Sequence, residues 1–122
     1  MTIKILIVDD EPHIVRLVSF KLKKAGFDVV AADHGQQAID LALSERPAVV
    51  LLDVMLPDID GYTVCGQLKE QLGADAPAIA LLTARSQQSD VLQGYECGAD
   101  SYITKPFDPD DLLTTVQQLL QN

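Results

Sequence analysis

The stretch AVVLLD, residues 48–53, decides the fold, because it is a short unbroken apolar run that ends in a carboxylate. Pro47 precedes the run and Pro57 follows it, so the pattern predicts a strand that is buried on both faces. Such strands belong to parallel sheets covered by helices, and these sheets bind ligands just beyond the carboxyl ends of their strands. Asp53 is therefore placed where a ligand would bind. The alternative is that it only caps the strand or starts a turn, a common role for an Asp near a Pro.

Composition indicates one globular domain, since 48% of the 122 residues are hydrophobic. A chain of this size buries a real core and leaves no room for a second one, so residues 1–122 are expected to form a single domain. There are 18 acidic and 9 basic residues, and the net charge of −9 argues against direct binding of nucleic acid. A bound cation or a basic partner is the more natural counterpart.

The sequence also bears on location and on its cysteines and histidines. No apolar stretch approaches the roughly 20 residues of a membrane span, and the start MTIKILIVDD lacks the layout of a signal peptide, so a cytoplasmic protein without membrane contact is expected. Cys65 and Cys97 lack metal-like spacing and are expected to be reduced thiols. His13 and His34 are expected to be surface residues.

Short apolar runs alternate with amphipathic stretches along the chain. The predicted strands cover residues 3–8, 29–32, 48–52, 78–82 and 102–104. The predicted helices run from Pro12 to a stop at Gly26, from Asp33 or Gly35, after Asp60 and Gly61, over about 87–97 with an end at Gly98, and from Pro109 with Asp108 as N-cap. This alternation predicts an α/β fold of (βα)5 type, a doubly wound five-stranded parallel sheet whose leading strand order is the flavodoxin-like 2-1-3-4-5.

The predicted strand order brings three acids to one crevice. Winding reverses between the first and third strands, and these strands end at Asp9 and Asp10 and at Asp53. Clustered carboxylates repel one another unless a cation joins them, and all-oxygen ligation selects Mg²⁺ or a similar hard ion. A Mg²⁺ and phosphate site is therefore predicted. Asp9 and Asp10 can also serve as a helix-entry turn ahead of Pro12, and both roles can hold together.

Two further strand ends carry groups that bind phosphoryl oxygens. LLTA, residues 81–84, places the Thr83 hydroxyl and the Ala84 backbone N–H at the same edge, and ITKPF, residues 103–107, places Lys105 there. Each alone is weak evidence, since a threonine at a strand end is ordinary and a lysine is usually a solvated charge. Together with the acids, these groups form a candidate phosphoryl-binding site built from the ends of four strands.

The motifs ILIVDDEP, LLDVMLPDIDG, LLTA and SYITKPF occur in this order and span essentially the whole chain. In them the chain resembles the receiver (CheY-like) domain of two-component response regulators. The resemblance implies that Asp53 is the phosphoacceptor, that Asp10 is a direct Mg²⁺ ligand, and that Asp9 assists mainly through water. It further implies that the Met55 carbonyl completes the metal ligands. The phosphoryl oxygens would be held by Thr83, by Lys105 and by the backbone of Met55 and Ala84.

The resemblance also implies a function in a phosphorelay. A sensor histidine kinase or a histidine phosphotransfer protein would donate the phosphoryl group to Asp53. The domain would catalyse only its own phosphorylation and autodephosphorylation, so it would not be a conventional enzyme. Thr83 would then move and Tyr102 would swing inward, changing the surface of the fourth helix, fifth strand and fifth helix for a downstream protein or output domain. The alternative is that Tyr102 is an edge-strand aromatic without a switching role.

Some positions vary among receivers or depart from a subfamily pattern. Met55 and Arg85 stand where side chains tune the hydrolytic water, and the Lys105–Pro106 peptide is expected to be cis. The C-terminal half is similar to receivers of winged-helix transcription factors. Val91 and Thr115, however, replace the basic residues usual on the dimer face of that subfamily. A monomer and a phosphorylation-dependent dimer both stay open.

Other classes of protein share parts of this pattern. The chain, which ends at QQLLQN, is compatible with a stand-alone receiver and with the N-terminal fragment of a longer DNA-binding or enzymatic regulator. A Mg²⁺-dependent phosphohydrolase of the haloacid dehalogenase type would carry a second Asp where Met55 stands. A flavodoxin would have Ser, Thr and Gly in place of the acidic loop DDEP. A pseudo-receiver would lack the acids or Lys105, and all of these residues are present.

Overall fold

A computed structural model describes residues 2–84 and 97–121. Its sheet has five parallel strands in the order β2-β1-β3-β4-β5, which confirms the predicted α/β fold and strand order. The strands are β1 (Lys4–Val8), β2 (Asp28–Ala32), β3 (Val49–Asp53), β4 (Ala78–Ala84) and β5 (Ser101–Lys105).

Four α-helices are described, and each starts at the predicted residue or within one position of it. They are α1 (Pro12–Lys24), α2 (Gly35–Glu45), α3 (Gly61–Leu72) and α5 (Pro109–Leu120), and the short 3-10 helix η1 (Gly73–Asp75) follows α3. Of the two predicted starts for α2, Gly35 is the one observed, with His34 as its N-cap. The Asp108 carboxylate caps α5 by accepting the Asp110 N–H at 2.8 Å. The helix predicted over about 87–97 lies outside the described residues, except for its last position.

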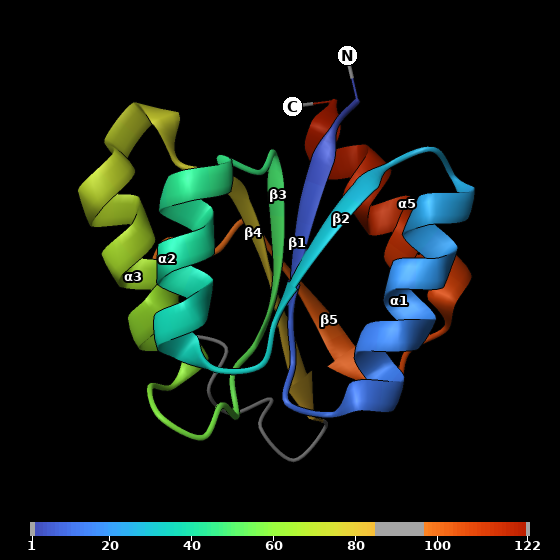
Figure 1. The fold of residues 1–122 in the computed structure, drawn as a ribbon, viewed down its shortest axis with the longest axis horizontal. Helices are drawn as coiled ribbons and strands as arrows, with labels where there is room; N and C mark the ends of the chain where they lie inside the picture. Colours follow the sequence, from blue (N-terminus) through green and yellow to red (C-terminus); the bar gives the residue numbers. More distant parts are fainter. Residues whose placement is uncertain (1, 85–96, 122) are drawn as a thin grey trace.

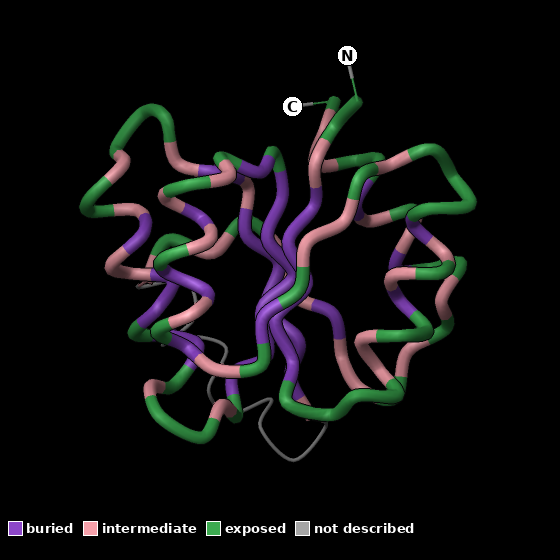
Figure 2. Tube along the Cα trace, in the orientation of Figure 1, coloured by how far each residue is buried: buried purple, intermediate pink, exposed green. Residues whose placement is uncertain are grey.

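The helices form a layer on each side of the sheet (Figure 1). Helices α2 and α3 cover one face with Ala38, Ile39, Ala42, Val64, Cys65 and Leu68. Helices α1 and α5 cover the other face with Val18, Leu22, Leu112 and Val116. Burial is deepest along the central strands (Figure 2), and every residue of β3 is buried. Residues 49–53 of the apolar run are therefore a strand covered on both faces, as predicted, whereas Ala48 precedes the strand and is exposed.

Three strands extend further at their carboxyl ends than the apolar pattern predicts, and the residues added there are polar or small. Asp53 is part of β3 and pairs with Leu82, while β4 continues through Thr83 and Ala84. The β5 ladder likewise includes Lys105 opposite Ala84. Backbone hydrogen bonding between parallel neighbours does not depend on side-chain hydropathy, so the ladder continues beyond the apolar residues. As a result, these side chains project from regular strands and not from loops.

Two smaller expectations also agree with the structure. Cys65 and Cys97 are both thiols, and the Cys65 Sγ lies 3.5 Å from the Cys97 carbonyl oxygen. The Lys105–Pro106 peptide bond is cis. Among the described residues, no helix has the length and apolar character needed to cross a membrane.

Candidate functional site

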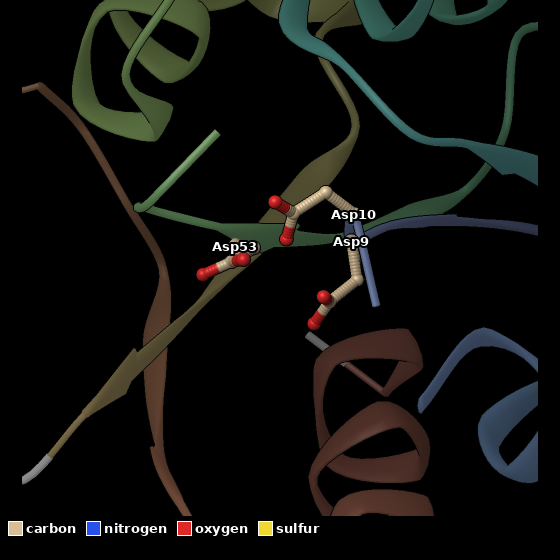
Figure 3. A group of neighbouring side chains, drawn as sticks. All are labelled: Asp9, Asp10 and Asp53. Atoms are coloured by element: carbon tan, nitrogen blue, oxygen red, sulfur yellow. The ribbon is translucent and has the colours of Figure 1, made fainter. Parts of the chain in front are cut away.

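Three carboxylates gather at the carboxyl ends of β1 and β3 (Figure 3). One oxygen from each of Asp9, Asp10 and Asp53 lies within 4.8 Å of the others. Asp9 is 0% exposed and Asp53 is 4% exposed, whereas Asp10 is exposed. The cluster is therefore enclosed on the protein side and open to solvent at Asp10.

Strand alternation explains why the main charged groups share one side of the sheet. Successive side chains of a strand point to opposite faces, so a residue shares the face of the residue two positions before it. Asp9, Asp53 and Lys105 each come two positions after a buried residue that packs toward α1 and α5. Those preceding residues are Ile7, Leu51 and Ile103. The face covered by α1 and α5 thus carries the two buried acids and the lysine.

Lys105 links the buried acids. Its Nζ lies 2.6 Å from Asp9 Oδ2, 3.5 Å from Asp53 Oδ2 and 3.9 Å from Glu11 Oε1. Burial by itself lowers the pKa of Lys105, but the hydrogen bond to Asp9 and the charges of Asp53, Asp9 and Glu11 together outweigh it and raise the pKa. The lysine is therefore a fixed cation at this site.

A backbone hydrogen bond orients the Asp53 carboxylate, and the pKa of this group lies above its ordinary value. Burial raises its pKa, and the neighbouring charges of Asp9 and Asp10 raise it further. The backbone N–H of Met55, which donates to Asp53 Oδ1 at 3.1 Å, and the Lys105 ammonium lower the pKa but do not cancel the effect of burial. Asp53 thus also starts a turn after β3, which was the alternative role predicted for it. A cation at the cluster would favour its ionised form.

Asp9 and Asp10 differ in the partners of their oxygens. Asp9 Oδ1 accepts the N–H of Glu11, the N-cap of α1, at 3.0 Å, and Asp9 Oδ2 accepts from Lys105. The helix-entry role therefore holds for Asp9 alongside its place in the cluster. Asp10 lines an open cleft of about 350 Å³ between α1 and the ends of β2 and α2, together with residues that include Arg16 and Gln37. Solvent can therefore reach the cluster from this side.

The donor set fits a hard divalent cation. The three carboxylates supply only oxygen, two of them are held by the ends of rigid strands, and the third is open to water. Mg²⁺ commonly takes one or two protein carboxylates and keeps several positions for water and phosphate oxygens. Because Lys105 neutralises only part of the negative charge, the cluster favours a further cation.

The other predicted residues are placed as follows. Thr83 is buried near the end of β4 and stands opposite Thr104, while Ala84 stands opposite Lys105. Thr83 is two positions after Leu81, so it shares the sheet face of α2 and α3, and the half-buried Tyr102 packs against that same apolar cluster.

Six more positions were named from the sequence, and four of them lie among the described residues. The Met55 residue is 65% exposed. His13 is exposed and His34 is half-buried, and both side chains reach solvent, as predicted for surface residues. Arg85 and Val91 lie outside the described residues. Thr115 of α5 is half-buried, and its hydroxyl donates to the Asp111 carbonyl at 3.1 Å.

Sequence reasoning missed one glycine that the site depends on. A Cβ on Gly61 would overlap the Asp53 carbonyl oxygen and lie 2.7 Å from the Val54 Cα. Its N–H donates to the Val54 carbonyl at 3.0 Å, which brings the start of α3 back against the end of β3. In the sequence, the Asp-Gly pair at residues 60–61 indicates only a helix start, and no local signal reveals this close approach.

Asp58 was missed as well, for a different reason. Its carboxylate accepts the backbone N–H of Gly35 at 2.6 Å and that of Gln36 at 3.0 Å. The partners lie 23 and 22 positions away, so no spacing rule connects them. Only the packing of the β3–α3 loop on α2 brings them together.

Comparison with known proteins agrees with this geometry. The family model of the response regulator receiver domain matches residues 5–117, and this chain belongs to that family. The family is one of signalling domains and not of conventional enzymes.

Two curated relatives are transcription regulators. The chain is 45% identical to the DNA-binding dual master transcriptional regulator RpaA of Synechocystis over 119 residues, which are 97% of this chain and 49% of the relative. It is 43% identical to the alkaline phosphatase synthesis transcriptional regulatory protein PhoP of Bacillus subtilis over 121 residues, which are 99% of this chain and 50% of the relative. This chain therefore spans about half the length of these relatives.

Solved structures show the same fold. The BeF3-activated DrrB receiver domain is 40% identical, with a TM-score of 0.88 and full coverage of both chains. The chemotaxis response regulator CheY4 of Vibrio cholerae is 31% identical, with a TM-score of 0.90 and coverage of 98% of this chain and 99% of that one. The predicted receiver family and CheY-like fold are thereby confirmed.

Proposed function

We propose that this receiver domain accepts a phosphoryl group on Asp53 from a phosphohistidine of a sensor histidine kinase or a phosphotransfer protein. The observation that carries the proposal is the position of Asp53. It is a buried carboxylate at a strand end, with Lys105 Nζ at 3.5 Å and oxygens of Asp9 and Asp10 within 4.8 Å. A phosphoryl group on Asp53 would meet a fixed ammonium on one side and metal-binding oxygens on the other.

The transfer forms one bond and breaks one. A carboxylate oxygen of Asp53 attacks the phosphorus, an O–P bond forms, and the P–N bond to the imidazole breaks. The electron pair of that bond remains on the leaving nitrogen, so Asp53 needs no general base. The Met55 N–H holds Asp53 Oδ1 and orients the carboxylate for attack. Lys105 offsets charge on one phosphoryl oxygen, and the Thr83 hydroxyl and the Ala84 N–H donate to the others.

The residues that would hold Mg²⁺ are Asp9, Asp10, Asp53 and the backbone carbonyl of Met55. Asp10 is the direct ligand among the first two, because this residue is exposed, whereas Asp9 is fully buried. Asp9 acts mainly through water, since both of its oxygens already accept hydrogen bonds. Bound Mg²⁺ would supply neutralising charge for the phosphoryl oxygens.

Hydrolysis would end the signal. Water attacks the phosphorus, the O–P bond breaks, and inorganic phosphate leaves while the Asp53 carboxylate is restored. The side chains of Met55 and Arg85 tune this step through access of water. The domain thus catalyses only its own phosphorylation and dephosphorylation.

Thr83 and Tyr102 would transmit the change. Both lie on the sheet face of α2 and α3, one on β4 and the other on the edge strand β5. Movement of the Thr83 hydroxyl toward the phosphoryl group would let Tyr102 turn inward and reshape the surface of β5 and α5. Since the chain spans about half of its transcription-factor relatives, the receiver of a longer cytoplasmic regulator is favoured over a stand-alone domain. Such a regulator would be a monomer or a phosphorylation-dependent dimer.

Intact mass spectrometry tests the central proposal. Incubation with phosphoramidate or acetyl phosphate and Mg²⁺ should add one acid-stable, base-labile phosphoryl group, and a chelator should prevent it. Asp53→Ala should remain unmodified. Asp28→Ala, which removes an exposed acid at the start of β2, should behave like the wild type. A wild-type protein without the adduct, or Asp53→Ala with it, would contradict the proposal.

A further inference from the structure

Asp58 ties the loop after the phosphoacceptor strand to a helix that is distant in sequence. The loop covers residues 54–60, between β3 and α3. From it the Asp58 carboxylate accepts the first two N–H groups of α2, from Gly35 at 2.6 Å and from Gln36 at 3.0 Å. The local N-cap His34 makes no side-chain cap bond, and its Nδ1 pairs with Asp33 instead. The β3–α3 loop therefore supplies the cap that α2 lacks.

Close backbone packing accompanies this cap. A Cβ on Gly35 would lie 2.9 Å from the Ile59 Cβ and 3.1 Å from the Ile59 carbonyl oxygen, so only glycine lets the loop approach α2 this closely. The N–H of Gln36, followed by that of Gly35, lowers the pKa of Asp58 to about 2 in spite of the opposing effect of burial. Asp58 thus remains a carboxylate at neutral pH, and this part of the loop is held by two charge-assisted hydrogen bonds.

The same loop begins at the site. Met55, two positions after Asp53, donates its N–H to Asp53 Oδ1 at 3.1 Å. Only Leu56 and Pro57 separate Met55 from Asp58, and the ring of Pro57 fixes one backbone angle. Few backbone angles between Asp58 and Met55 are free to change. A displacement of Asp58 should therefore also displace Met55.

We propose that Asp58 is a positioning residue that fastens the β3–α3 loop to α2, holds Met55 against Asp53, and so sets the Mg²⁺ affinity of the carboxylate site. Asp58 itself touches neither the metal nor the phosphoryl group. The effect of Asp58 on Mg²⁺ affinity rests on the proposed function, in which Asp53 and the Met55 carbonyl are metal ligands. The alternative is that Asp58 is a local cap that affects α2 alone.

Backbone amide exchange in the metal-free protein separates these roles. Asp58→Ala should speed exchange at Gly35 and Gln36 in either case, because their acceptor is gone. It should also speed exchange at Met55, by about tenfold, only if the cap positions the loop. The charge-matched control is Glu45→Ala, which removes an acid from the other end of α2, where it pairs with Lys4 at 3.5 Å. Unchanged exchange at Met55 in Asp58→Ala would overturn the proposal.

A Mg²⁺ titration supplies the second test. Asp58→Ala should raise the half-saturating Mg²⁺ concentration about tenfold, while the extent of phosphorylation at saturating Mg²⁺ stays near that of the wild type. Asp58→Asn keeps one acceptor oxygen, so its half-saturating Mg²⁺ concentration should fall between that of the wild type and that of Asp58→Ala. Equal values for Asp58→Ala, Asp58→Asn and Glu45→Ala would mean that only charge matters and would overturn the positioning role.

The two proposals can fail separately. If the wild type binds Mg²⁺ but never acquires a phosphoryl group, the proposed function fails, whereas a response of Met55 and of Mg²⁺ affinity to Asp58→Ala would still support the positioning role. If the wild type is phosphorylated on Asp53 and the Asp58 variants match it in both measurements, only the positioning role fails. Should Asp58→Ala not fold, Asp58→Asn carries both tests.

Discussion

Lys105 Nζ lies 2.6 Å from Asp9 Oδ2, although the two residues are 96 positions apart in the chain. Asp9 is fully buried, and among the described residues this ammonium forms an ion pair with it. The same Nζ is 3.5 Å from Asp53 Oδ2. Lys105 is therefore shared between an acid of the proposed metal site and the proposed phosphoacceptor. A phosphoryl group arriving on Asp53 would compete with Asp9 for it.

Removal of this shared cation should separate metal binding from phosphoryl transfer. In Lys105→Met, Asp9 loses its ammonium partner, so Mg²⁺ should bind several-fold more tightly. Phosphorylation at saturating Mg²⁺ should nevertheless slow by about 10²-fold, because one phosphoryl oxygen loses its counter-charge. Metal titration and the rate of adduct formation measure the two effects. Lys4→Met, at the opposite end of β1, should change neither, and weaker Mg²⁺ binding in Lys105→Met would contradict this account.

The raised pKa of Asp53 predicts a pH-dependent cost in stability. Burial raises this pKa above its ordinary value of 3.8, so between 3.8 and the folded-state pKa the native protein binds more protons than the unfolded chain. Stability contributed by Asp53 therefore falls as pH rises through that window, and the full penalty remains at neutral pH. Asp53→Asn keeps an acceptor for Met55 and should be more stable than the wild type by about 1 kcal/mol at pH 7 without metal.

Urea unfolding in chelator at pH 7 and pH 4 measures this difference. The advantage of Asp53→Asn should shrink at pH 4, where the wild-type group approaches its neutral form. Asp28→Asn, an exposed acid on β2, should show no advantage at either pH. A variant at position 53 that is less stable than the wild type at pH 7 would rule out the burial argument.

Two glycines of α3 should respond in opposite ways to alanine. Gly61→Ala places a methyl group against the Asp53 and Val54 backbone, which cannot move aside without displacing the site, and should cost about 1–3 kcal/mol. Gly66→Ala meets only the Cys97 Cβ at 3.9 Å and should stabilise the helix by up to about 1 kcal/mol. Urea unfolding gives both values, and phosphorylation should fall only in Gly61→Ala. Equal tolerance of both changes would disprove the close approach.

Thr83→Ala and Tyr102→Ala should uncouple the switch from the chemistry. Both variants should still be phosphorylated on Asp53, because neither removes the nucleophile or its metal ligands. The chemical-shift changes that beryllofluoride induces along β5 and α5 should be smaller in each variant than in the wild type. Thr114→Ala, an exposed position on α5, is the matched control. Wild-type shift changes in both variants would remove these residues from the switch.

The architecture could be predicted because its main signals are local. Five apolar runs separated by amphipathic stretches predict alternating strands and helices, and a strand with no polar face requires helices on both sides. The pattern could not predict that β3, β4 and β5 continue into Asp53, Thr83 and Lys105. Ladder hydrogen bonds extended these strands, and hydropathy does not report on them.

The candidate site was only partly predictable. Asp9, Asp10, Asp53, Thr83 and Lys105 stand at strand ends, so topology alone brings them to one edge of the sheet. The supporting contacts are different, because they join loop and helix positions for which no periodicity exists. Asp58 caps α2 from another loop. Gly61 has no side chain and therefore lets the start of α3 lie directly against the Asp53 backbone.

The sequence by itself determined which residue types stand at the carboxyl ends of the strands, and with them the class of chemistry this domain can perform. Only the tertiary structure decided how the charges are shared. It brought the Lys105 ammonium into a hydrogen bond with the Asp9 carboxylate, left Asp10 open to solvent, and raised the pKa of Asp53 through burial. The alternation of strands and helices follows from patterns of neighbouring residues, whereas electrostatic energies depend on distance and on exclusion of water, which exist only once the chain is packed.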